Sequence, residues 1–140
     1  MNQGAVSDSN ESVAFLAAMQ EAQRVSEHYA DAPARFLNAW KKAVEMIGPE
    51  YFHCEVFEDC AIATNREKLR PDTQAIERYL SVCSVGQGVF IGAVISFFNG
   101  DWGAEISSSF GYSGLGDIAN RLDLNELEVI IELMQSHTGW

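Results

Sequence analysis

The chain has 140 residues, of which 47% are apolar, and it carries a formal net charge of −11 at pH 7. This length is typical of a single domain with a sizeable core, and the apolar content excludes an intrinsically disordered chain. Because an acidic surface repels phosphate backbones, direct nucleic-acid binding is not expected.

Cysteine usage and the start of the chain predict a cellular compartment. No basic segment followed by an apolar core and a small-residue cleavage site opens the sequence, which predicts a cytoplasmic protein. The cysteines, Cys54, Cys60 and Cys83, are odd in number and cannot all pair within the chain. We therefore expect reduced thiols.

The first residues are small and polar and predict a flexible N-terminal arm over 1–8, followed by one globular domain over 9–140. A helix is expected after the arm, because apolar side chains recur at helical spacing along one face. The members of this face are Phe15, Ala18, Met19, Ala22, Val25 and Tyr29.

A second, separate helix is predicted to begin near Asp31, because Pro33 suits a first helical turn. It should end at Gly48-Pro49. Its large apolar side chains share one face and are expected to lie in the core: Phe36, Trp40, Val44 and Ile47.

The segment 51–64 has a different pattern, in which β-branched and aromatic residues alternate or cluster around a corner at Glu58-Asp59. This pattern predicts one small β-hairpin. Beyond it, Asp72 is a suitable cap for a helix that extends to about Cys83.

Between Tyr79 and Gly100 no side chain is charged. A membrane span is not expected, since polar and small residues around Gln87 leave an apolar block shorter than the roughly 20 residues that cross a bilayer. A buried central helix over about 85–98 is predicted instead, with Ser84 and Gln87 as its capping box. Small residues recur every fourth position in it and would let another helix, from this chain or a second copy, approach closely: Ser84, Gly88, Gly92 and Ser96.

A continuous apolar run does not distinguish helix from strand, so an alternative stays open. In that alternative a second hairpin over 89–110 turns at Asn99-Gly100. The favoured fold is mainly α, a single-domain helical bundle around the central helix with one small hairpin at 51–64. The alternative is an α+β fold with the second hairpin at 89–110.

No residue pattern predicts catalysis, a metal site or a cofactor. His53, Cys54 and Cys60 could suggest zinc, but five residues separate the two cysteines, unlike the short knuckles of structural zinc sites. The glycine-rich segments lack the context of a phosphate-binding loop. We therefore expect no cofactor, no catalytic residue and no metal ligand.

Aromatic and acidic residues of the last forty or so positions are the remaining candidates for function. A terminal tryptophan either packs on its own domain or contacts a partner, and an acidic last helix could engage a basic protein. The candidate interaction residues are Trp102, Trp140, Asp117, Asp123, Glu126, Glu128 and Glu132.

Three functional classes follow from these observations. The favoured one is a small non-enzymatic protein-interaction module, an adaptor or oligomeric accessory protein, with a protein partner or self-association. The first alternative is a nucleic-acid mimic that inhibits a DNA-binding protein. The second alternative is an unrecognised enzyme or ligand-binding domain.

Overall fold

The computed structural model describes residues 3–54 and 57–140. Within these ranges the chain forms seven α-helices and two short 3-10 helices and contains no strand. The mainly α prediction is therefore confirmed. None of the described helices is both long and apolar enough to cross a membrane.

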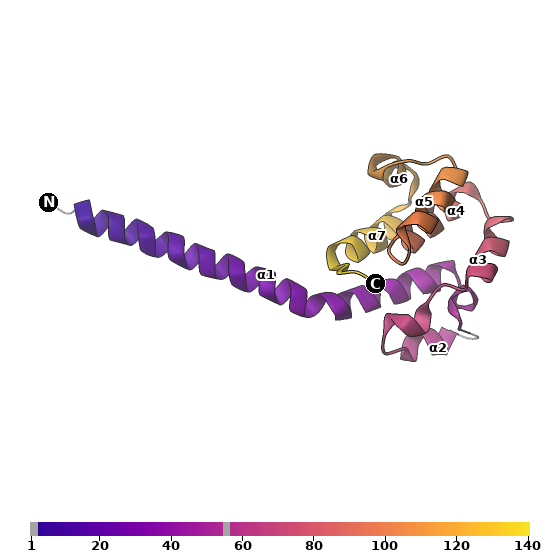
Figure 1. Ribbon diagram of the computed structural model, residues 1–140, viewed down its shortest axis with the longest axis horizontal. Coiled ribbons are helices and arrows are strands. Elements are labelled where there is room, and N and C mark those ends of the chain that lie inside the picture. Colours follow the sequence, from indigo (N-terminus) through magenta and orange to yellow (C-terminus); the bar gives the residue numbers. More distant parts are fainter. Residues whose placement is uncertain (1–2, 55–56) are drawn as a thin grey trace.

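Helix α1, Gln3–Ile47, is 45 residues long, and its first half projects from the rest of the molecule (Figure 1). The prediction of two separate helices is wrong, since α1 continues through Pro33. Proline cannot donate to the carbonyl four residues earlier. Here that carbonyl belongs to Tyr29, in an exposed turn where water can bind it, and Figure 1 shows α1 bending where it meets the folded domain.

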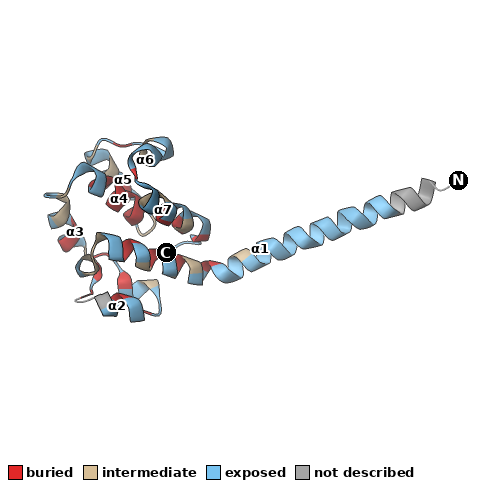
Figure 2. Ribbon diagram, turned by 180° about the vertical axis from the view of Figure 1, so that it is seen from behind, coloured by how far each residue is buried: buried red, intermediate tan, exposed pale blue. Residues whose placement is uncertain are grey.

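The arm predicted over 1–8 lies partly outside the described residues. Residues 1–2 are not described, and the backbone of residues 3–8 belongs to α1. The flexibility of this segment stays a prediction. Among residues 9–31 none is buried, so the core begins at Ala32 (Figure 2).

The hairpin predicted over 51–64 is wrong. The described residues of this region form η1, Pro49–Phe52, and α2, Phe57–Ile62, while residues 55–56 lie outside the described ranges. The backbone closes locally, because the amide of Tyr51 donates to the carbonyl of Gly48 over 3.1 Å. Phe52, Cys54, Cys60 and Ala63 are buried in the core that includes α1, whereas Ile62 is exposed.

Two further short elements lead to the central helix. In η2, Arg66–Leu69, the side chain of Asn65 caps the first turn. Helix α3, Thr73–Leu80, begins as predicted at Asp72, whose carboxylate accepts a hydrogen bond from the amide of Ala75 over 3.1 Å.

The buried helix predicted over about 85–98 is observed as α4, Val85–Ser96, in which every residue from Gly88 to Ile95 is buried. Its predicted capping box, formed by Ser84 and Gln87, is present. The alternative hairpin over 89–110 is wrong, because Asn99 caps α5, Gly100–Ser109, by accepting from the amide of Trp102 over 3.0 Å.

Helix α5 of the same chain packs against the row of small residues on α4. A Cβ atom added at Gly92 would lie 2.7 Å from the hydroxyl of Ser107. One added at Gly103 of α5 would lie 2.5 Å from the Cα atom of Ser96. These separations are too short for a side chain, so the two helices are in close backbone contact.

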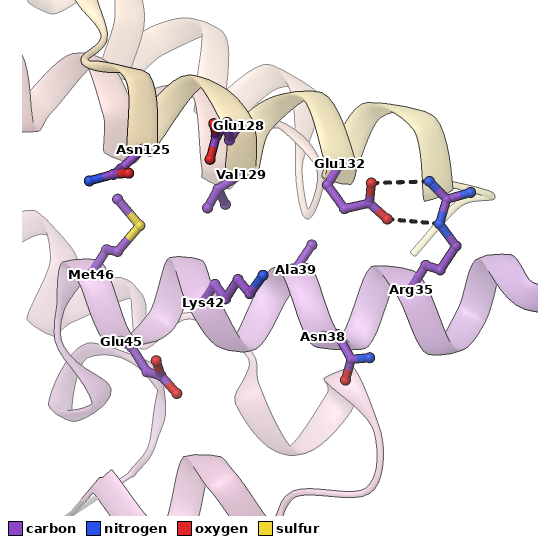
Figure 3. Close-up of a pocket in the computed structure, with 10 residues that line it drawn as sticks. All are labelled: Arg35, Asn38, Ala39, Lys42, Glu45, Met46, Asn125, Glu128, Val129 and Glu132. Atoms are coloured by element: carbon purple, nitrogen blue, oxygen red, sulfur yellow. Dashed lines mark hydrogen bonds and ion pairs between the residues drawn. The ribbon is translucent and has the colours of Figure 1, made fainter.

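The last two helices are α6, Leu115–Arg121, and α7, Leu124–Ser136. Asp123 and Glu126 form the predicted capping box of α7. Helix α7 lies antiparallel to the second half of α1, with Glu132 beside Arg35 and Asn125 near Met46 (Figure 3). The face of α1 that was predicted to be core is buried, with Phe36, Trp40 and Val44 almost inaccessible to solvent and Ile47 partly buried.

Candidate protein-interaction surfaces

The first half of α1 is the most exposed apolar element of the described chain. We call residues 9–31 the α1 extension. All of its residues are exposed except His28, which is half-buried and stacks edge-on against the ring of Tyr29 at 5.2 Å between centroids. Large apolar side chains nevertheless lie along it: Val13, Phe15, Leu16, Met19, Val25 and Tyr29.

The apolar residues of the α1 extension continue a face that is buried further along the same helix. Phe15 and Tyr29 lie on the helical face that continues to Ala32 and Phe36. Phe15 is 66% and Tyr29 62% exposed, whereas Ala32 and Phe36 are 0% and 1% exposed. The domain therefore covers only the second half of one continuous apolar face.

Polar side chains on the opposite side of the α1 extension pair within the helix over residues 21–27, whereas Val13 and Leu16 lie on that side nearer its start. Arg24 forms an ion pair with Glu21 at 2.7 Å, and the amide of Gln23 donates to Glu27 over 2.9 Å. The hydrogen bond from Arg24 lowers the pKa of the Glu21 carboxyl. Such pairs at three or four residues' spacing support a helix whose polar side faces water.

A groove of about 640 Å³ runs between α1 and α7 (Figure 3). At one end Arg35 holds Glu132 through two hydrogen bonds, of 2.8 and 3.0 Å. The hydrogen bond from Arg35 lowers the pKa of Glu132, and Lys42 contributes in the same direction. Both partners of the pair are about one-third exposed, so it orients α7 on α1 without adding much stability.

The acidic residues singled out from the sequence have different roles in the structure. Asp123 and Glu126 cap α7, Glu128 lines the groove, and Glu132 pairs with Arg35. Asp117 lies 3.5 Å from the amide of Ser113. They do not form one row of unpaired carboxylates, and their binding of a basic partner stays a prediction.

The two candidate tryptophans contact their own chain. The indole N–H of Trp102 donates to Glu77 over 2.9 Å. The ring of Trp140 packs edge-on against Trp40 at 4.8 Å and Phe98 at 5.0 Å, and the guanidinium of Arg66 lies 5.1 Å from its centroid. Of the two arrangements considered for a terminal tryptophan, the structure has the one packed on its own domain.

His137 belongs to the same aromatic cluster, 5.5 Å from the ring of Phe36 and 5.3 Å from that of Phe97. Burial lowers the pKa of His137, and the charge of Arg66 lowers it further. We expect the free energy of unfolding to be highest above pH 6.5, because there the histidine is neutral in both states. It should fall as the pH drops below 6.5, since the unfolded chain then binds a proton that the folded chain does not.

Urea unfolding between pH 7.5 and 5 measures this dependence. His137→Gln should reduce the slope in this window, because it removes the titrating group. The pairing of Glu132 with Arg35 adds no slope in this window, because its stabilisation is fully present above the ordinary pKa of a glutamate and is lost only as the pH falls below that value. An identical slope in the variant would contradict the assignment to His137.

The described cysteines are buried or half-buried. Burial raises the pKa of the Cys54, Cys60 and Cys83 thiols, which leaves less thiolate than a cysteine nucleophile requires. Within residues 3–54 and 57–140 no three His, Cys, Asp or Glu side chains are grouped so as to hold a metal ion.

Sequence reasoning recognised the apolar face of the α1 extension but placed it in the globular domain. The signal that was available is the unbroken helical periodicity across Pro33, which joins the two predicted helices into one. A comparison of the chain with models of protein families, with curated proteins and with solved structures finds no significant match.

Proposed function

We propose that this protein is a non-enzymatic protein-interaction module that docks through its α1 extension. The observation that carries the proposal is the exposure of one helical face, with Phe15, Met19, Val25 and Tyr29 between 42% and 66% exposed. A contiguous exposed apolar surface on a soluble domain marks an interaction site. Scattered single apolar residues would carry no such meaning.

Energetics support the same conclusion. Most of the stability of a helix in a protein comes from packing of its apolar face, and the α1 extension is not covered by the described part of the domain. Full burial of one large apolar side chain contributes about 1.5–3 kcal/mol. Covering several of them by a partner would stabilise both the helix and the complex.

In this proposal the folded domain holds the α1 extension in a fixed position. The helices around α4 form a single-domain helical bundle, and the second half of α1 is anchored in its core by Phe36, Trp40 and Val44. The protein works in the cytoplasm as an adaptor or oligomeric accessory protein. The groove between α1 and α7 is a second candidate surface, lined by acidic side chains (Glu45, Glu128, Glu132) and by the basic Arg35 and Lys42.

Site-specific photo-crosslinking tests this function. A benzophenone side chain in place of Tyr29 should form adducts with a protein in cells, a second copy of this chain included. The same group in place of Gln20, on the polar side of the helix, is the matched control and should give far fewer adducts. Equal labelling at both positions, or no protein adduct at position 29, would contradict the proposed docking face.

A further inference from the structure

We infer that a pocket between α1, η2 and the segment after α7 binds a small organic carboxylate, and that Arg66 holds the carboxylate group. This inference goes beyond the proposed function, because the ligand is a small molecule and not the protein that contacts the α1 extension. It is carried by the lining of the pocket, by the hydrogen-bond donors of Arg66 and by the charge around them.

The Arg66 pocket has a volume of about 390 Å³ and lies where α1 enters the folded domain. Segments far apart in the sequence line it, because Thr64, Asn65 and Arg66 surround the start of η2 and Thr138 follows α7. Small-molecule sites typically have volumes of about 300–1,000 Å³ and combine apolar walls with a few polar groups. Here the apolar wall comes from α1 and consists of Pro33, Ala34 and Leu37.

The guanidinium of Arg66 has donors that the described protein does not use. Arg24, Arg35 and Arg70 each pair with a carboxylate, whereas no described residue forms an ion pair or a hydrogen bond with the half-buried side chain of Arg66. An arginine has five N–H donors in a planar fork that matches the two oxygens of a carboxylate. A carboxylate in the pocket would satisfy two of these donors.

Aromatic rings hold Arg66 in place. Its guanidinium carbon lies 5.4 Å from the ring centroid of Phe36 and 5.1 Å from that of Trp140, within the range of cation–π contacts. The backbone is also fixed here, because the side chain of Asn65 accepts a hydrogen bond from the amide of Lys68 over 3.2 Å. The rings attract the charge but provide no oxygen acceptor. A cation that is already positioned lowers the ordering cost of binding an anion.

Charge favours a carboxylate over a phosphate. The pocket is lined by one basic and no acidic side chain, whereas three glutamates line the groove between α1 and α7. The chain has a net charge of −11, so a dianion such as phosphate would be repelled by the rest of the protein and would find a single arginine in the pocket. A singly charged carboxylate needs one guanidinium, and an apolar body attached to it can contact the wall from α1.

An NMR titration of the protein with hexanoate at neutral pH tests the ligand class. Saturable shifts of the backbone amides of Ala34, Thr64 and Thr138 are expected, with saturation below about 10 mM. Hexanamide has nearly the same shape without the charge and should bind at least about tenfold more weakly. Inorganic phosphate should not displace hexanoate. Equal binding of hexanamide, or displacement by phosphate, would overturn the carboxylate assignment, and the absence of saturable shifts would overturn the site.

Variants test the location of the site. Arg66→Gln should weaken hexanoate binding at least about tenfold, because the charged fork is lost. Lys68→Gln is the matched control, since it removes the same charge from an exposed position of the same 3-10 helix outside the pocket, and it should bind hexanoate like the wild type. Thermal melting checks that both variants are folded. Unchanged affinity in folded Arg66→Gln would overturn the role of Arg66.

Ala34→Leu tests the pocket without altering Arg66 or the rings beside it. Ala34 is an exposed residue of α1 on the apolar wall, so a larger side chain there narrows the pocket without disturbing the core. Hexanoate binding should weaken severalfold. Wild-type affinity in Ala34→Leu would overturn the placement of the ligand against α1.

The pKa of His137 provides an independent readout of the charge at Arg66. Burial lowers this pKa, and the charge of Arg66 lowers it further. The rings of Phe36, from α1, and Phe97, at the end of α4, also contact His137 and carry no charge. A carboxylate bound to Arg66 offsets its charge, so the pKa of His137 followed by NMR should rise when hexanoate is added. An unchanged pKa in the saturated wild-type protein would overturn the contact between the carboxylate and Arg66.

Discussion

Replacing Trp40 with alanine is expected to lower the free energy of unfolding by about 3–5 kcal/mol. Trp40 is 0% exposed and stacks on Phe36 at 5.9 Å, with Phe52 and Trp140 edge-on to its ring. Its removal opens a cavity where the second half of α1 meets the loop region and the end of the chain. The packing of α1, the loop region and the end of the chain against one another depends on these contacts of Trp40.

A smaller substitution separates packing from hydrogen bonding. The indole N–H of Trp40 donates to the carbonyl of Leu69 over 2.9 Å in the buried core. Trp40→Phe keeps an aromatic ring but leaves that carbonyl without its donor, which costs about 1–3 kcal/mol. Urea unfolding measures both variants, and a loss under about 1 kcal/mol for Trp40→Ala would show that Trp40 is not a central core residue.

Gly103→Ala is expected to destabilise the protein by about 1–3 kcal/mol, although alanine is the better helix former. The added Cβ would lie 2.5 Å from the Cα atom and 2.6 Å from the amide nitrogen of Ser96. Both are backbone atoms of α4 and cannot turn aside as a side chain can. The two helices would have to separate along their whole contact.

Gly100 in the same helix is the matched control. Nothing lies within 4 Å of a Cβ atom added there, so Gly100→Ala should be neutral or stabilise the protein by up to about 1 kcal/mol. Urea unfolding of the two variants compares the same chemical change in a closed and an open position. Equal stability of the two variants would show that α4 and α5 are not in close backbone contact.

Local signals in the sequence were sufficient for several elements. The capping boxes at Ser84 and Asp123 were correctly predicted, because a cap depends on residues only three positions apart. The burial of α4 was predicted from its lack of charge, since an uncharged helix is stable only when it is covered. The cap at Asp72 was also predicted correctly.

Other elements depended on contacts that no local pattern contains. The residues after Gly48 were predicted as a hairpin because their alternation fits a strand. In the structure Phe52, Cys54 and Cys60 are buried in the core that includes α1, a tertiary contact that the local pattern does not contain. Asn99-Gly100 fits a hairpin turn, and it also fits a helix end with glycine in the left-handed cap position. In the structure it is neither, because Asn99 is the cap at which α5 begins. The close packing of α5 against α4, which leaves no room for a Cβ atom at Gly92 or Gly103, favoured the helix.

The candidate interaction surface shows the same division. The sequence by itself determined that one face of residues 9–47 is apolar and helical, because periodicity is a property of neighbouring residues. Only the tertiary structure decided that Phe36 and Trp40 lie in the core while Phe15 and Tyr29 lie outside it. The physical reason is length: α7 is shorter than α1 and ends beside Arg35, so none of the described helices extends far enough to cover the remaining face of α1.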